Sequence, residues 1–242
     1  MRISFLAVAW LAAGAFHAVA APVPPVTHQA FSSPGTPSVA LHVVRFDRTR
    51  TALRVIDLPP GTTVAEGARA RGALAGVNGG YFQPDRTPLG LVISEGRMLH
   101  PLEQSKLLTG LLAVTPRGAS LLRNAEFRPG RAGIREALQA GPFLVDHGRA
   151  VAGLNGDRRA ERTVLLADRR GVAALLTAGP VTLAEMGRIL ASPGLVEGLE
   201  IDRALNLDGG SSTALWVQGE PPFSRPEWKP VRNAVAVVPA GS

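Results

Sequence analysis

The stretch ALNLDGGSSTALWV, residues 204–217, places one carboxylate, two glycines and three hydroxyl side chains between two apolar, strand-like runs. A β-hairpin needs only about two turn residues, and Asp-Gly alone is a strong hairpin signal. The second glycine and the row of hydroxyls exceed that need, unless Ser211 or Thr213 only caps neighbouring amides. The stretch is therefore either an elaborate turn or one wall of a ligand site that contains Asp208.

The composition indicates a globular protein with room for a hydrophobic core. The 242 residues are 45% hydrophobic and 19% charged, which suits one domain. The absence of cysteine excludes disulfides and thiolate catalysis.

The formal net charge of +7 comes almost entirely from arginine, since only Lys106 and Lys229 are lysines. The arginines are dispersed and aromatic residues are few, so we expect no nucleic-acid partner. The charge either reflects an arginine-biased composition of the surface, or it serves to attract anionic substrates or a polyanionic envelope.

The first twenty residues, MRISFLAVAWLAAGAFHAVA, have the pattern of a secretory signal peptide cleaved after about Ala20. The alternative is a membrane anchor, but the apolar run is short for a span of ~20 residues. We expect a periplasmic or secreted protein with no stable membrane span after cleavage. Residues 21–38, rich in Pro and Ser, are expected to form a flexible lead-in to a domain over residues 39–240.

Turn signals about every ten residues predict many short strands. Residues 40–47 and 51–58 are predicted to form a hairpin, and residues 133–151 a short helix or loop followed by a strand. The T-x-x-E patterns at Thr63 and Thr182 predict two capped helices. The pattern predicts an α+β fold: a single domain with many short, mostly antiparallel or mixed strands and a few helices packed on the sheet.

Common catalytic motifs are absent from the sequence, including G-x-S-x-G, H-E-x-x-H, the Walker loop and G-x-G-x-x-G. The five histidines are dispersed, so no zinc site is expected. The candidates that remain are polar residues beside glycines at the ends of predicted strands, where they can gather at one edge. They are Asn78-Gly79-Gly80, Gly141-Pro142, Arg162-Thr163 and Asp208. Taken singly, each has a structural explanation as a turn or a surface ion pair.

Several blocks in order along the chain give it a resemblance to the phosphodiester glycosidase family, which includes the domain of N-acetylglucosamine-1-phosphodiester α-N-acetylglucosaminidase, the "uncovering" enzyme, and bacterial exopolysaccharide-related members. The blocks are GVNGGYF (76–82), PLGLVISEGR (88–97), ALQAGPFLVDHG (137–148), RT (162–163), TLAEMGRIL (182–190), ALNLDGGSSTAL (204–215) and KPVRNAVAV (229–237). The resemblance covers nearly all of the chain after residue 20. It implies hydrolysis of the bond between a sugar's anomeric carbon and a phosphodiester.

The family pattern implies a site that includes the polar strand ends. The residues it implicates are Asn78, Gly79, Gly80, Gly141, Arg162, Thr163, Asp208, Gly209, Gly210, Ser211, Ser212 and Lys229. Lys229 stands where many members carry arginine, which keeps the charge but loses the bidentate fork.

Within this site we assign Asp208 as nucleophile, base or cation-stabilising carboxylate. Arg162 and the amides near Gly79 or Gly209 would stabilise the leaving phosphate, while Asn78 and Ser211 would orient sugar or phosphate oxygens. A second catalytic carboxylate could come from three acidic residues, between which the sequence does not decide: Asp202, Glu200 and Asp85.

Glycoside hydrolysis commonly uses two carboxylates, and the sequence leaves open whether it is retaining or inverting here. The predicted partner is a carbohydrate-phosphate substrate, in exopolysaccharide or cell-envelope polymer metabolism.

Two other function classes remain open at this stage. One is a non-catalytic envelope protein that binds anionic polysaccharide in the same pocket. The other is a metal-dependent phosphodiesterase, in which Asp208, Asn78 and the hydroxyls ligate Mg²⁺ or Ca²⁺. No cofactor is required by the pattern, a divalent cation is possible, and the sequence leaves the metal ligands and oligomeric state unknown.

Overall fold

The computed structural model describes residues 24–35, 37–128 and 133–242, and the predicted signal peptide lies outside these ranges. The described chain forms three sheets in which every pairing between named strands is antiparallel. The seven-stranded sheet has the order β1 (Val26–Ser32), β2 (Ala40–Phe46), β13 (Gly171–Val181), β12 (Ala160–Asp168), β14 (Arg203–Asn206), β10 (Phe143–Asp146), β11 (Arg149–Ala150).

The other two sheets have five strands each. One has the order β16 (Phe223–Arg225), β15 (Leu215–Val217), β4 (Ala75–Asn78), β17 (Asn233–Pro239), β3 (Thr51–Asp57). The other has the order β6 (Arg97–His100), β5 (Val92–Ser94), β9 (Glu136–Ala140), β7 (Gly110–Thr115), β8 (Gly118–Arg123). We call the three the first, second and third sheet in this order.

The α+β fold class predicted from the sequence is wrong. The fold is mostly β, with 45% of the described residues in strands and 10% in helices. The described residues contain two α-helices, α1 (Val64–Ala70) and α2 (Leu183–Leu190), and two 3₁₀ turns, η1 (Asn124–Glu126) and η2 (Gly210–Ser212). Residues that were expected to begin as a helix or loop, 136–140, instead form β9, in which every residue is buried.

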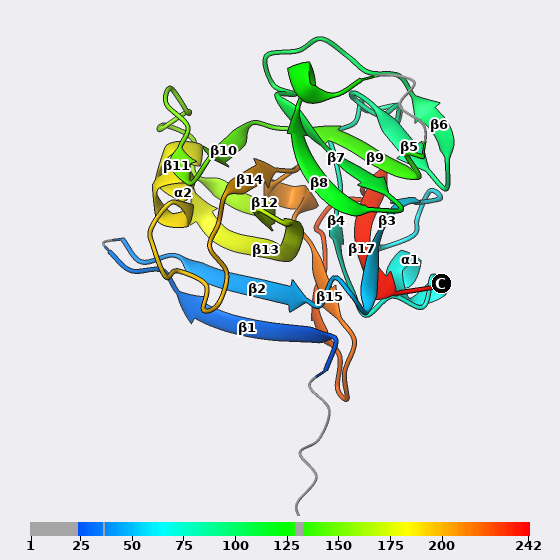
Figure 1. The fold of residues 1–242 in the computed structure, drawn as a ribbon, viewed down its shortest axis with the longest axis horizontal. Helices are drawn as coiled ribbons and strands as arrows, with labels where there is room; N and C mark the ends of the chain where they lie inside the picture. Colours follow the sequence, from blue (N-terminus) through cyan, green and yellow to red (C-terminus); the bar gives the residue numbers. More distant parts are fainter. Residues whose placement is uncertain (1–23, 36, 129–132) are drawn as a thin grey trace, which may run out of the picture.

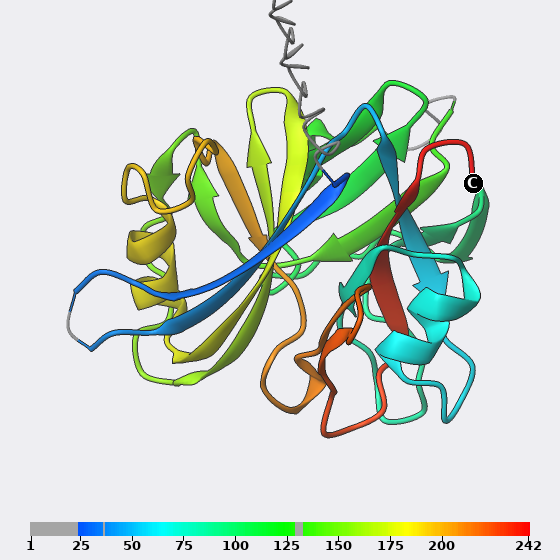
Figure 2. The ribbon, with the colours of Figure 1, turned by 90° about the horizontal axis from the view of Figure 1, so that it is seen from below.

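Both capping boxes are confirmed. Thr63 accepts a hydrogen bond from the amide of Glu66, whose carboxylate accepts from the amide of Thr63, and Thr182 and Glu185 repeat the arrangement. Each cap satisfies amides that the first helical turn leaves unpaired. The helices lie on opposite outer sides of the molecule, α2 against the first sheet and α1 against the second (Figure 2).

The hairpin predicted over residues 40–58 is wrong. β2 pairs with β1 and β13 in the first sheet, whereas β3 pairs with β17 in the second. The short connection between them carries the chain from one sheet to the next, and both strands contribute to a shared core. Local turn signals do not determine which sheet a strand joins.

The predicted lead-in also contains regular structure. Residues 26–32 form β1, which pairs with β2 over its whole length. Val26 and Phe31 pack against two core clusters, which explains why this part of the segment is ordered against the sheet.

One hydrophobic core is common to all three sheets. It includes Leu165 and Leu205 from the first, Val77 and Val235 from the second, and Leu138 from the third. Figure 1 shows the first sheet with α2 on one side of the molecule and the other two sheets with α1 on the other side. No helix among the described residues has the length and apolarity that crossing a bilayer requires.

Candidate active site

The stretch 204–217 is not a hairpin, because its two apolar runs belong to different sheets. β14 lies in the first sheet and β15 in the second, and η2 lies between them. The amide of Leu207 donates to the carbonyl of Thr163 on the first sheet, and the amide of Asp208 donates to the carbonyl of Gly79 at the end of β4. Asp208 therefore lies where the first and second sheets meet.

Asn78 joins the predicted strand ends directly. Its Oδ1 accepts from the Thr163 hydroxyl at 2.6 Å and from the Ala214 amide at 3.1 Å, and its Nδ2 donates to the Asp208 carbonyl at 2.8 Å. The side chain is fully buried. In this arrangement Asn78 holds the Asp208 loop in place and presents no exposed atom to a substrate.

Gly141 joins the same cluster through Tyr81 and Asn206. The Tyr81 hydroxyl donates to the Gly141 carbonyl at 2.7 Å, and Asn206 Nδ2 lies 3.0 Å from that hydroxyl and 3.1 Å from the same carbonyl. Burial and the charge of Asp208 raise the pKa of Tyr81, so its hydroxyl stays protonated. All four predicted strand ends are thus connected.

Gly79 and Gly209 are required because backbones approach each other closely. A Cβ on Gly79 would lie 2.0 Å from Asn233 Oδ1, and one on Gly209 would lie 2.6 Å from the Glu161 carbonyl oxygen. Their amides are also occupied, since Gly79 donates to the Asn233 carbonyl and Gly209 to Asp208 Oδ1 at 2.8 Å. These two N–H groups, which the sequence suggested for a leaving phosphate, already have acceptors in the protein.

The remaining loop residues differ in accessibility. The Gly80 amide donates to Asn233 Oδ1 at 2.8 Å, Ser212 is buried, and Ser211 is exposed. Gly210 has a φ of 62°, a conformation that favours glycine. Within the described ranges the amides of Gly210 and Ser211 have no acceptor, so they are the N–H groups near Asp208 that an anion could use.

Asp208 is a half-buried carboxylate with a perturbed pKa. Burial raises the pKa of its carboxyl, while hydrogen bonds from Ser212 and the Gly209 amide, and the charge of Arg158, partly oppose that rise. A carboxylate with a raised pKa is a stronger base than an exposed one and is typical of catalytic sites.

Arg162 is directed into the protein rather than outward. Its Nε donates to the Val181 carbonyl at 3.0 Å and its Nη2 to the Arg158 carbonyl at 2.8 Å, and the residue is 9% exposed. Part of the guanidinium expected to bind phosphate is therefore bound to backbone. Arg158 is exposed, and its charge acts on Asp208, Tyr81 and Arg162.

Residues 204–217 pass from the first sheet to the second, and we call them the crossing stretch. A second loop lies against its exposed part. The Ser211 carbonyl accepts from the amides of Trp228 and Lys229, at 2.9 and 3.1 Å. Both side chains are exposed, that of Trp228 by 84%. Lys229 is thus connected to the site through its backbone, beside an exposed aromatic face.

The three candidates for a second carboxylate make their contacts outside the Asp208 cluster. The Asp202 amide donates to the Ala167 carbonyl near the far end of β12, and Asp202 lines a separate cavity with Glu200. Asp85 accepts from the amide of Thr87 within its own turn. In the described part of the chain, no cluster of three His, Asp or Glu side chains that could hold a metal is present.

Three residues of the cluster were not singled out from the sequence: Tyr81, Asn206 and Arg158. Tyr81 is the single tyrosine and directly follows Asn78-Gly79-Gly80, and Asn206 precedes Asp208 by two positions. Their closeness in sequence to Gly80 and Asp208 is a signal that could have identified both residues. Arg158 is one of several arginines before β12, and only the folded chain shows which of them acts on Asp208.

Comparison with known proteins identifies the family. A family model described as phosphodiester glycosidase matches residues 71–238, which include every strand end of the cluster. The chain belongs to the phosphodiester glycosidase family. The resemblance inferred from the sequence blocks is therefore confirmed. No curated protein sequence matches the chain significantly.

Solved structures share the fold of this phosphodiester glycosidase family member. The zebrafish N-acetylglucosamine-1-phosphodiester α-N-acetylglucosaminidase catalytic domain, auto-inhibited by its pro-peptide, has a TM-score of 0.68 and 16% identity, covering 89% of this chain and 84% of its own. A hypothetical protein from Synechocystis has a TM-score of 0.62, 19% identity and coverages of 88% and 62%. A putative exported protein from Burkholderia pseudomallei has a TM-score of 0.58, 16% identity and coverages of 85% and 75%.

Proposed function

We propose that this family member is an exported hydrolase that cleaves the glycosidic bond of sugar-1-phosphodiesters of the N-acetylglucosamine-1-phosphodiester type. The observation that carries the proposal is the position of Asp208. A carboxylate with a raised pKa lies on the crossing stretch of a phosphodiester glycosidase, next to unused amides and an exposed arginine.

The proposed chemistry divides the substrate between two groups of residues. Asp208 acts at the anomeric carbon, as nucleophile, base or stabiliser of an oxocarbenium-like transition state. A phosphodiester leaves as a weakly basic anion, so stabilising its charge matters more than protonating it. We assign that role to Arg158 and the amides of Gly210 and Ser211, with buried Arg162 adding positive charge; the exposure of Arg158 and the unused amides support this.

The loop that contains Trp228 and Lys229 completes the proposed site on its exposed side. An exposed tryptophan offers a flat apolar face of the kind that packs against a sugar ring. Lys229 contributes a point charge to the same region, suited to a phosphate oxygen.

Product analysis on sugar-phosphodiesters in ¹⁸O water tests the proposal. UDP-GlcNAc and GlcNAc-phosphate-methyl should both yield free GlcNAc with ¹⁸O in the sugar, and the Asp208→Asn variant should release none. ¹⁸O in phosphate together with full chelator sensitivity would identify a metal-dependent phosphodiesterase instead. Binding without turnover across the panel would identify a polysaccharide-binding protein.

The export and envelope context is part of the same proposal and rests on the sequence of residues 1–20. Expression of the full chain in a Gram-negative host should give a periplasmic or secreted protein that begins at about Ala21. Retention of the uncleaved chain in the membrane fraction would contradict export with cleavage.

A further inference from the structure

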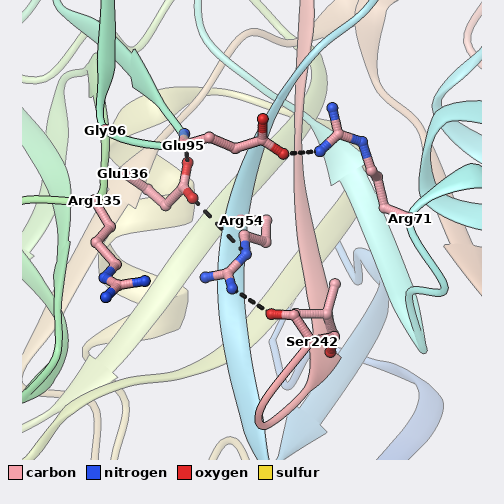
Figure 3. A pocket seen from close by; sticks show the side chains of 8 residues that line it. Arg54, Arg71, Glu95, Gly96, Arg135, Glu136 and Ser242 are labelled. Carbon is pink, nitrogen blue, oxygen red and sulfur yellow. Dashed lines mark hydrogen bonds and ion pairs between the residues drawn. The ribbon is translucent and has the colours of Figure 1, made fainter.

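A second concentration of charge lies far from Asp208. A cavity of about 410 Å³ is lined by Arg54, Arg71 and Arg135 together with Glu95 and Glu136 (Figure 3). The guanidinium groups of Arg54 and Arg135 point toward the same open space in this view.

This cavity lies at the opposite strand ends from the candidate active site. β9 runs from Glu136, which lines the cavity, to Ala140, which precedes Gly141 of the site. β17 likewise runs from Asn233, bonded to Gly79, to the chain end beside the cavity. At roughly 3.3 Å per residue, about 17 Å of β9 separates the two regions.

An adjoining cavity of about 530 Å³ shares Arg54, Arg135 and Ser242 with the first, so the two lie side by side and we treat them together. We call the pair the arginine groove. The described residues that line its larger part include five arginines and no aspartate or glutamate: Arg48, Arg54, Arg117, Arg135 and Arg170.

Protein carboxylates compensate only some of this charge. Arg54 pairs at 3.8 Å with the buried Glu136, and Arg48 and Arg170 both bind Asp168.

The other two arginines of the larger part, Arg117 and Arg135, are exposed, and neither has a carboxylate partner in the described part of the chain. Like charges facing one hollow repel each other, so an anion that enters it relieves that repulsion.

We propose that the arginine groove is a second binding site, which holds an acidic polysaccharide through its phosphate or carboxylate groups while Asp208 acts elsewhere. Guanidinium forks match both kinds of anionic oxygen. The described lining of the larger part contains one aromatic residue, the half-buried Phe46, so it offers no row of aromatic faces on which successive bases could stack. The choice of a glycan over other polyanions rests on the proposed function.

Fluorescence anisotropy with a labelled oligogalacturonate, inorganic polyphosphate and a single-stranded oligonucleotide of matched charge tests the proposal. The double variant Arg117→Gln/Arg135→Gln should weaken oligogalacturonate binding by about tenfold or more. The matched control Arg149→Gln/Arg188→Gln removes two exposed charges from β11 and α2 and should change binding less than about twofold.

Three results would overturn the proposal. They are equal weakening in both double variants, loss of binding in Asp208→Asn, and tighter binding of the oligonucleotide than of the glycan. Polyphosphate binding to the groove at the glycan's affinity would show that the groove accepts phosphate as well as carboxylate groups, and weaker polyphosphate binding would show a preference for carboxylates; both support the site.

The same variants separate this site from the proposed function. Arg117→Gln/Arg135→Gln should release GlcNAc from GlcNAc-phosphate-methyl at the unchanged rate, and Asp208→Asn should bind oligogalacturonate like the unaltered protein. If neither the unaltered protein nor any variant releases sugar, while the groove still binds oligogalacturonate, the proposed function is rejected and the second site is retained.

Discussion

The ionised form of Asp208 lowers the stability of the folded protein, but it is the form that the proposed chemistry uses. Burial raises the pKa of its carboxyl in the folded protein, so the folded state favours the protonated form more than the unfolded state does. Between the unfolded pKa and the raised folded pKa, increasing pH therefore lowers stability. Below both pKa values the carboxyl is neutral in both states and this cost disappears.

The Asp208→Asn variant should therefore be more stable than the unaltered protein at neutral pH while inactive. Each 1 kcal/mol of relief raises Tm by roughly 2–4 °C in a domain of this size. Thermal unfolding of both proteins at pH 3.5 and 7.5 measures the effect, with the gain confined to the higher pH. A gain of equal size at both pH values would show that the carboxylate's charge is not its cause.

Arg158 and Arg159 offer an adjacent pair with different surroundings. Arg158 is exposed and its charge acts on Asp208, whereas Arg159 is bound to Glu185 on α2 at 2.8 Å. Arg158→Gln should lower kcat/KM for a sugar phosphodiester by about 10-fold to 100-fold, since it removes a charge facing the developing anion. It should also raise the pKa that governs the acidic limb of the pH–rate profile, because that charge no longer opposes ionisation of Asp208. Arg159→Gln should leave both quantities unchanged, and equal losses in the two variants would contradict the role of Arg158.

At the scale of elements, the connection from β4 to the crossing stretch depends on the absence of a side chain at Gly79. A Cβ there would lie 2.0 Å from Asn233 Oδ1, whereas one on Gly179 in β13 would make ordinary contacts at 3.7 Å or more. Gly79→Ala should displace the loop, lower the Tm and reduce sugar release. Gly179→Ala should fold and react normally. Differential scanning calorimetry and the GlcNAc assay together check this, and a neutral Gly79→Ala would contradict the packing argument.

The elements that sequence reasoning predicted correctly are those specified by neighbouring residues. The Thr63 and Thr182 caps each depend on a few consecutive positions. The connections β2–β3 and β14–β15 were misread as hairpins, or left open, because sheet membership depends on distant partners. The same limit applies to the candidate site. Motifs located Asp208 and Asn78, but the inward direction of Arg162 follows from its bonds to distant backbone.

For the whole molecule, the core shared by the three sheets implies cooperative unfolding. Leu165 belongs to the first sheet, whereas Trp216, buried in the second, reports on its own surroundings. Leu165→Ala should cost about 2–5 kcal/mol, as truncations in a packed core do. Far-UV circular dichroism and tryptophan fluorescence should then shift to the same lower Tm. Separate transitions for the two probes would show that the sheets unfold independently.

The antiparallel strands that run from the Asp208 region to the arginine groove have a consequence for how the protein can change. Loops at one end of the strands hold the residues proposed for chemistry, and connections at the other end hold four of the five arginines, with Arg54 in β3 itself. Under the two proposals, substitutions in the turns alter what the protein binds without altering the bond it hydrolyses. A lineage could acquire a new polymer at one end while the reaction at the other stays the same.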